Sequence, residues 1–421
     1  MSSSALPVAG APAAAPAAAG SSPLPGRLAS LDALRGFDMF WILGADALVH
    51  ALSEVHGSAV ARFFAGQLDH KEWAGFAFYD LIFPLFIFIS GVSLVYSLSR
   101  QIAQQGRATA ARHVVIRGVV LFLLGIFYSG GFTNPWPDLR LLGVLQRIAL
   151  AYTGAGLLFC FLRPRALAAV CAALLVGYWA LLTFVPIRDF QLEKAALAAR
   201  LGTAKPTLAQ VESAFAGTTA RVTGRFDFGL NLTNHLDFQY LPGRKYDTYW
   251  DPEGYLSTLP AVATCLLGVF AGLLLRRTDL DDARKLRALL IAGAIALALG
   301  WLWHLQFPVI KKIWTSSFVL VAGGYSLLLL GAFFYVVEIR LWRGWCVPFI
   351  WIGMNPITLY VANNVIGFRR LAQRFAGGDI KAWCDATLGA GAGQGLLAIV
   401  GLALMFVLAR FLYQRRIFLR V

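Results

Sequence analysis

About ten apolar runs, each near twenty residues long, constrain this 421-residue chain more than any other feature. A helix of about twenty residues is long enough to cross the hydrocarbon core of a bilayer. The mean hydropathy of +0.65 and the 14% of charged residues fit a chain that lies mostly in lipid. We therefore predict an all-α, polytopic membrane helix bundle. The predicted spans are residues 33–52, 78–98, 114–131, 144–162, 166–186, 256–275, 287–305, 315–337, 346–366 and 393–413.

The segments outside these spans suggest a simple domain organisation. Residues 1–26 are rich in Ala, Pro, Ser and Gly and lack the pattern of a secretory signal, so we predict a disordered cytoplasmic tail. Residues 27–421 are expected to form a single transmembrane domain. The one long connection, residues 187–255, is too polar to cross a membrane. It is expected to form an extramembrane cap or a partly ordered loop.

The net charge of +15 comes mainly from Lys and Arg residues between the apolar runs. This distribution is typical of membrane orientation and argues against nucleic-acid binding. The basic residues favour the side that carries both termini, which are therefore predicted to be cytoplasmic. The five cysteines form no CxxC pair and the histidines show no metal-ligand spacing. We therefore predict no metal site.

The segment from Leu68 to Gly91, LDHKEWAGFAFYDLIFPLFIFISG, opens with a polar cluster and continues as an apolar helix. His70, Trp73 and Asp80 lie in or just before its first turns. A histidine where a membrane span meets water can titrate near neutral pH and contact a bound substrate. We predict that this segment is the chemical centre.

Two further spans carry polar side chains at membrane depth. In the first, Arg35 and Asp38 can pair along one helix face, whereas Asp46 has no such local partner. Asp46 is therefore a functional candidate, with a role in helix packing as the alternative. At the start of the fourth span, Gln146 and Arg147 either line a polar cavity or anchor the helix at the interface.

The end of the long loop and the later spans supply the remaining candidates. Asp251 and Glu253 can bind substrate, or can serve only to start the next helix. Lys311 and Trp314 precede the eighth span. Asn355 brings an amide to membrane depth where Pro356 breaks the ninth span, as in helices that line binding cavities, although a packing kink is commoner.

The ordered motifs LDALRG, HxxWxGxxxxDLIFPxFIFIxG, GVLQR, DPEG, Trp-Thr-Ser-Ser, GMN and RRIF resemble the heparan-alpha-glucosaminide N-acetyltransferase family of the transmembrane acyltransferase superfamily. The series runs from about Leu31 to Val421. The resemblance implies a bundle of ten or eleven membrane helices in a bacterial cytoplasmic (inner) membrane. It also implies acetyl transfer from cytoplasmic acetyl-CoA to a glucosamine amine on the outer side.

This resemblance also implies roles for individual residues. The family's catalytic histidine falls on His70, and its partner asparagine falls on Asp46, where this chain departs from the pattern. His70 would accept a proton from the amine while Asp46 fixes the imidazole tautomer. Arg35 and Arg117 are candidates for holding the phosphates of the cosubstrate.

Several alternatives remain at this stage. Transfer is expected to be direct, with an acetyl-histidine intermediate as the competing scheme. A transporter of amino sugars or oligosaccharides would use polar residues and a broken helix in the same way. An O-acyltransferase for envelope glycans would use the same histidine with a hydroxyl acceptor. The apolar helix faces are compatible with contacts to lipid and with a homodimer.

Overall fold

The structure is a computed structural model that describes residues 28–133 and 135–419, so the predicted tail lies outside the described residues. Helices make up nearly all of its regular structure, which confirms the all-α class. Eight helices are long and apolar enough to cross a membrane within the described part of the chain. They are α4 (Phe78–Gln105), α5 (Arg107–Tyr128), α6 (Val144–Phe161), α7 (Pro164–Phe184), α11 (Thr258–Leu275), α12 (Asp282–His304), α13 (Ser316–Phe334, continued by η4, Tyr335–Ile339) and α18 (Ala392–Gln414).

The first predicted span is not one regular helix. It consists of α1 (Ala29–Phe40), a π-helical turn η1 (Trp41–Ala45) and α2 (Asp46–His56). Gly44 has a φ of 118°, a conformation that side chains with a Cβ rarely adopt, and it breaks the α-helical path there. Asp46 therefore begins a new helix beyond the break.

The ninth predicted span is bent where Pro356 was expected to break it. It comprises η5 (Gly344–Cys346) with α14 (Val347–Gly353), and then α15 (Pro356–Ile366), at 69° to each other. Counted as one span, this pair raises the number to nine. Asn355 lies at the bend, where its side chain bonds the backbone of Ile417 and Leu419 at 3.0 and 3.1 Å.

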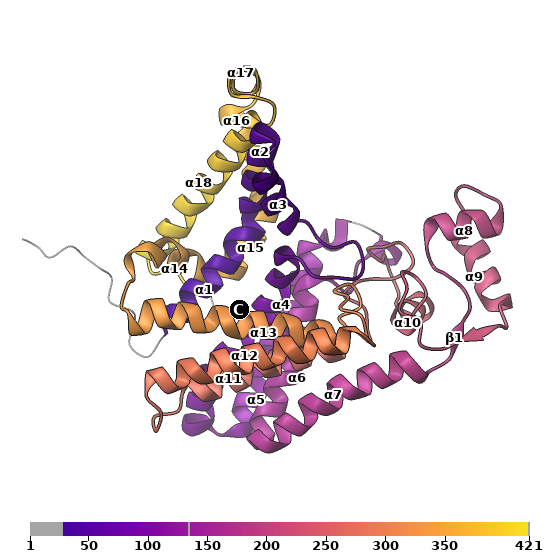
Figure 1. Cartoon of the computed structure of the whole chain (residues 1–421), viewed down its shortest axis with the longest axis horizontal. Helices are drawn as coiled ribbons and strands as arrows, with labels where there is room; N and C mark the ends of the chain where they lie inside the picture. Colours follow the sequence, from indigo (N-terminus) through magenta and orange to yellow (C-terminus); the bar gives the residue numbers. More distant parts are fainter. Residues whose placement is uncertain (1–27, 134, 420–421) are drawn as a thin grey trace, which may run out of the picture.

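Close helix contacts hold the bundle together around α4 (Figure 1). A Cβ at Gly91 would lie 2.0 Å from the backbone oxygen of Cys265, and one at Gly268 would lie 2.0 Å from that of Phe88. The backbones of α4 and α11 therefore touch, as is usual where small residues face each other in membrane helices. This contact fixes α4, whose first turn carries Asp80.

Residues 187–255 form an ordered cap at the end of α7 (Figure 1). The cap contains α8 (Lys194–Leu201), α9 (Leu208–Gly217), α10 (Leu232–Tyr240) and the antiparallel strands β1 (Ile187–Arg188) and β2 (Arg221–Val222). Its own apolar cluster includes Phe190, Val211, Phe215 and Trp250. This segment is therefore ordered and has an apolar cluster of its own.

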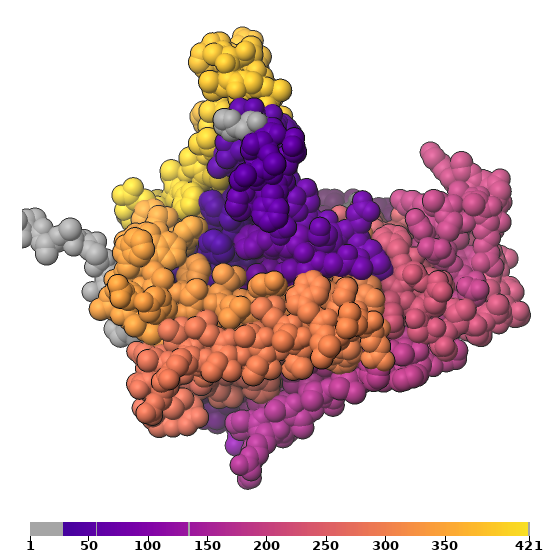
Figure 2. All heavy atoms as spheres, viewed as in Figure 1, coloured from indigo at the N-terminus to yellow at the C-terminus, as the bar shows by residue number. Residues whose placement is uncertain are grey.

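A second projection was not expected from the sequence. The end of α2, α3 (Ala59–Gln67), α16 (Phe368–Ala376), α17 (Asp379–Leu388) and one end of α18 form an arm that stands out from the bundle in Figures 1 and 2. The short helices η2 (Gly131–Thr133) and η3 (Trp136–Asp138) connect α5 to α6.

Candidate active site

Two adjoining cavities lie in the bundle. The first, of about 500 Å³, is called the His70 cavity, and the second, of about 730 Å³, the arginine cavity. Both are lined by Phe86, Ile148, Pro356 and Ile357, which we call the neck. Polar side chains lining the His70 cavity are His70, Lys71, Glu72, Tyr79, Arg140, Arg147, Tyr246, Glu253, Lys311, Lys312 and Tyr360. Those lining the arginine cavity are Asp32, Arg35, Ser90, Ser93, Tyr96, Ser97, Arg100, Arg117 and Tyr152.

The His70 imidazole is oriented by Asp80. His70 Nδ1 lies 3.0 Å from Asp80 Oδ1, while Asp80 Oδ2 accepts hydrogen bonds from the backbone of Ala77 and Lys71 at 3.1 and 3.3 Å. Asp80 is 1% exposed and occupies the first turn of α4, where the helix dipole favours a carboxylate. When Nδ1–H donates to this carboxylate, the neutral ring keeps Nε2 as a proton acceptor.

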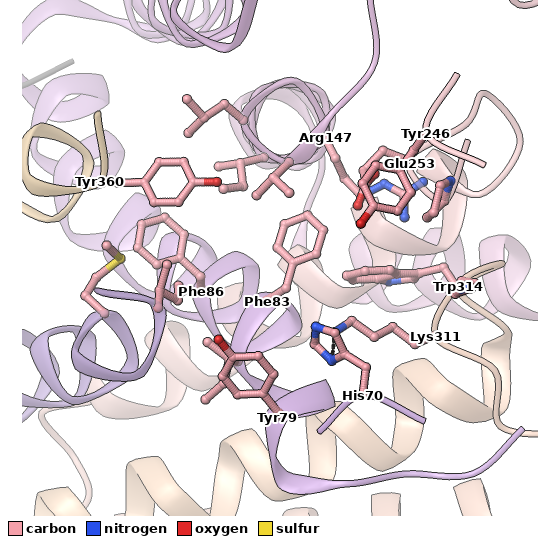
Figure 3. Close-up of a pocket in the computed structure, with 18 of the residues that line it drawn as sticks. His70, Tyr79, Phe83, Phe86, Arg147, Tyr246, Glu253, Lys311, Trp314 and Tyr360 are labelled. Atoms are coloured by element: carbon pink, nitrogen blue, oxygen red, sulfur yellow. Dashed lines mark hydrogen bonds between the residues drawn. The ribbon is translucent and has the colours of Figure 1, made fainter. Parts of the chain in front are cut away.

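Lys311 adds a positive charge beside the imidazole. Its Nζ lies 3.1 Å from His70 Nδ1 and 3.4 Å from Asp80 Oδ1, and Figure 3 shows its side chain against the His70 ring. Burial lowers the pKa of Lys311, and the neighbouring Asp80 carboxylate opposes this effect. A bridge between Ala74 and Ile310 fixes both segments relative to each other.

Asp46 contacts the imidazole only through an aromatic side chain. The Tyr79 ring lies 4.8 Å from the His70 ring, and Tyr79 Oη donates to Asp46 Oδ2 at 3.3 Å. The expected hydrogen bond from Asp46 to the imidazole is thus replaced by that of Asp80. α2 begins at Asp46 after the break at Gly44, and the Asp46 carboxylate bonds Tyr79. The segment after His70 instead folds so that Asp80, in the first turn of α4, bonds the imidazole.

A denser polar cluster lies on another part of the cavity wall. Arg140 bonds both carboxylate oxygens of Asp251 at 2.8 and 2.9 Å and Glu253 Oε2 at 2.7 Å. Arg147, which is 1% exposed, donates to Ser257 Oγ and lies over the Trp314 ring at 4.9 Å from its centroid. Burial, with the nearby Asp251 carboxylate, raises the pKa of Glu253 to about 7.

Four predicted site residues serve the scaffold around these cavities. Trp73 Nε1 donates to the backbone oxygen of Phe226 at 2.8 Å and so joins the His70 segment to the cap. Gln146 is buried against α5, since a Cβ at Gly125 would lie 2.4 Å from its Oε1. Asp251 pairs with Arg140, and Asn355 holds the segment near Ile417. None of the four lines either cavity within the described residues.

The arginine cavity brings together the predicted Arg35 and Arg117, together with Arg100. Arg35 donates to Asp32 Oδ1 at 3.0 Å and to Ser93 Oγ. The expected pair with Asp38 is therefore wrong, because Arg35 bonds Asp32 on the preceding turn and both carboxylate oxygens of Asp38 have no hydrogen-bond partner among the described residues. Arg117 lies over the Tyr152 ring, 4.9 Å from its centroid. Three guanidinium groups at one cavity suit a polyanionic ligand.

Comparisons with known proteins show what this chain is similar to. Residues 27–211 match the family model described as heparan-alpha-glucosaminide N-acetyltransferase, catalytic. The chain is 28% identical to human heparan-alpha-glucosaminide N-acetyltransferase over 384 residues, which are 82% of this chain and 54% of the human protein. The predicted family resemblance is confirmed.

The mouse heparan-alpha-glucosaminide N-acetyltransferase is 27% identical over 380 residues, which are 81% of this chain and 54% of the mouse protein. The chain thus spans about half the length of the curated relatives it matches. The heparan-alpha-glucosaminide N-acetyltransferase model covers His70, Asp80 and Arg147 and ends within α9, before Glu253 and Lys311.

Sequence reasoning did not select Arg140, Tyr79 or Arg100 as site residues. Arg140 lies in a loop and its carboxylate partners follow more than one hundred residues later, so no local pattern indicates the cluster. Tyr79 precedes Asp80 in the motif that was singled out, and only the helix rotation shows that its ring faces His70. A sequence signal existed for Arg100, which lies in the last turns of α4 at the start of a basic segment.

Proposed function

We propose that this protein is a transmembrane N-acetyltransferase that transfers acetyl from cytoplasmic acetyl-CoA to the amine of a glucosamine-type sugar on the outer side. The observation that carries this proposal is the junction of the two cavities. A histidine oriented by a buried carboxylate lines one cavity, three arginines line the other, and both cavities share the neck. The matched relatives support an acetyltransferase.

The arginine cavity suits the nucleotide and phosphates of acetyl-CoA. Arg35, Arg100 and Arg117 line this cavity and bring positive charge to it, and guanidinium groups bind phosphate oxygens through charge-assisted hydrogen bonds. The apolar neck suits the thin pantetheine arm, which would bring the thioester into the His70 cavity. A polyanion itself would not cross lipid, so a protein-lined passage is required.

In the His70 cavity, His70 is the proposed general base. The acceptor ammonium first loses one proton to solvent, and the free amine then attacks the thioester carbon. As the N–C bond forms, Nε2 of His70 takes the second proton, and the C–S bond breaks to release CoA thiolate, which takes up a proton. Asp80 stabilises the imidazolium, and positive charge on Lys311 would stabilise the developing oxyanion.

The proposal is tested with purified protein in liposomes, with acetyl-CoA on one side and glucosamine on the other. We expect N-acetylglucosamine on the acceptor side and free CoA on the donor side, whereas sugar accumulation without acetyl-CoA would indicate a transporter. His70→Ala should bind CoA but lose transfer by about a hundred- to ten-thousandfold. His113→Ala, at an exposed position on α5, is the control. Undiminished transfer by His70→Ala would overturn the assignment.

A further inference from the structure

Arg147 has two hydrogen-bond donors that the protein leaves open. Its Nη2 is held by Ser257 Oγ and lies 3.5 Å from the backbone oxygen of Gly254. Its Nε and Nη1 are buried and have no hydrogen-bond partner among the described residues. Buried polar groups are nearly always paired, because leaving them unpaired carries a large desolvation penalty. Since Arg147 lines the His70 cavity, a bound molecule can supply the missing acceptor atoms.

The charges around Arg147 disfavour an anion as that molecule. Arg140 pairs with Asp251 through Nε and Nη2 and with Glu253 through Nη2. Asp237 adds a third carboxyl group, because its Oδ1 accepts a bond from the Tyr255 backbone at 3.0 Å directly after the DPEG segment. The two guanidinium groups thus lie beside the carboxyl groups of Asp251, Glu253 and Asp237, which compensate part of their positive charge. Hydroxyl groups can instead accept from the guanidinium and donate to a carboxylate such as Glu253.

Arg147 and Glu253 lie apart from the residues that we propose for proton transfer. Figure 3 shows the Trp314 ring between Arg147 and Glu253 on one side and His70 and Lys311 on the other. An acceptor whose amine contacts His70 would have to extend past the Trp314 ring to place its hydroxyl groups at Arg147. The guanidinium is held in place by Ser257 and by the Trp314 face, so it is preorganised for such a contact.

We propose that Arg147 and Glu253 form a specificity subsite that recognises neutral ring hydroxyls of the acceptor sugar, on the other side of the Trp314 ring from His70. This inference rests on the proposed acetyl transfer and adds to it the part of the acceptor that is recognised. Arg147 selects the acceptor by its hydroxyl groups rather than by a negative charge.

The test compares acceptors in purified protein with saturating acetyl-CoA. The acceptors are glucosamine, its 3-, 4- and 6-deoxy analogues, a 2-amino-2-deoxyuronic acid, and tetrahydropyran-3-amine, which has a ring amine without hydroxyls. In the natural protein, loss of the recognised hydroxyl should lower kcat/KM about ten- to a hundredfold, as for a hydrogen bond to a charged group. The uronic acid should be no better an acceptor than glucosamine.

In Arg147→Gln, glucosamine should fall to the level of that deoxy analogue, while turnover of tetrahydropyran-3-amine stays within about twofold. Arg284→Gln, an exposed arginine on α12, is the matched control. An unchanged preference for hydroxylated acceptors in Arg147→Gln would overturn the inference, as would an equal loss with every acceptor. Preference for the uronic acid in the natural protein would also overturn it, in favour of anion recognition.

A CoA-binding measurement on each variant reports whether it has folded. Where Arg147→Gln does not bind CoA, Glu253→Gln carries the same comparison with the deoxy series, and an undiminished hydroxyl preference there overturns the inference. Absence of transfer to any amine by the natural protein would instead refute the proposed function itself, so the two failures are distinguishable.

Discussion

The His70 cavity and the arginine cavity share the neck but present different surfaces to a ligand. The His70 cavity combines an imidazole, carboxyl groups and cations with several aromatic rings. Among the described residues, the arginine cavity combines three guanidinium groups with serine hydroxyls and a single lining carboxylate, Asp32. The difference fits the two substrates of the proposed function, an amino sugar in the His70 cavity and the polyanionic acetyl-CoA in the arginine cavity. The apolar neck explains how a thin, neutral arm could join them.

The largest effect is expected from a change that removes the function of His70 as a base but leaves the residues that line both cavities in place. In Asp80→Asn an amide can donate to Nδ1 and so favour the tautomer with a proton on Nε2, which is the wrong form for a base. We expect kcat to fall about a thousandfold with little change in CoA binding. Asp69→Asn, an exposed carboxylate nearby, is the control. Retention of more than about a tenth of the activity would show that Asp80 does not orient the base.

Removing one arginine tests the other cavity. For Arg117→Ala we expect the KM for acetyl-CoA to rise about tenfold to a hundredfold, because a charge-assisted contact is lost, while the KM for glucosamine is unchanged. Arg112→Ala lies on the same helix at an exposed position and serves as the matched control. Steady-state kinetics with each substrate varied in turn measure both constants. A rise only in the KM for glucosamine would mean that the arginine cavity binds the acceptor sugar and not acetyl-CoA.

Changing Asp46 is expected to lower activity less than changing Asp80. For Asp46→Asn we expect a loss of about two- to tenfold, since the amide oxygen can still accept the bond from Tyr79 Oη. The measurement is kcat at saturating concentrations of both substrates. Complete loss of transfer would mean that the charge of Asp46, and not only its hydrogen bond, is essential.

The buried carboxyl groups near Arg147 should also make the free energy of unfolding depend on pH. Burial raises the pKa of Asp237 from 3.8 to about 7. Between these values the unfolded chain loses its proton while the folded protein keeps it, so the free energy of unfolding decreases as pH rises. The maximum slope from one group is about 1.4 kcal/mol per pH unit. Asp237→Asn should flatten the dependence of thermal unfolding on pH, leaving the contribution of Glu253, which has the same sign. An unchanged slope would contradict this assignment.

Much of the fold follows from local sequence patterns. Apolar runs predicted the long spans, and Pro356 predicted the bend between α14 and α15. The segment around His70 also placed Asp80 close by, because only a short turn separates them. By contrast, the π-helical turn at Gly44 depends on how α1 packs against its neighbours, and residues 367–391 are too short and polar to show as spans.

The pairing of side chains was harder to predict than the spans. Arg35 faces Asp32 rather than Asp38, and His70 bonds Asp80 rather than Asp46. Sequence spacing does not decide the first pairing, because Asp32 and Asp38 both stand three residues from Arg35. The second depends on how the segment around His70 folds back onto α4. The cluster of Arg140 with Asp251 needs two loops far apart in the chain to meet, which no sequence spacing reveals.

The central claim is that the two cavities form one passage through the neck, and a block at the neck tests it most directly. Ile357→Trp places a larger ring between the cavities, with Ile366→Trp at an exposed position of the same helix as the control. CoA binding and acetyl transfer to glucosamine are measured on the same preparations. We expect CoA affinity within about twofold of the natural protein and transfer reduced by about a hundredfold or more. Full transfer despite the filled neck would contradict the account.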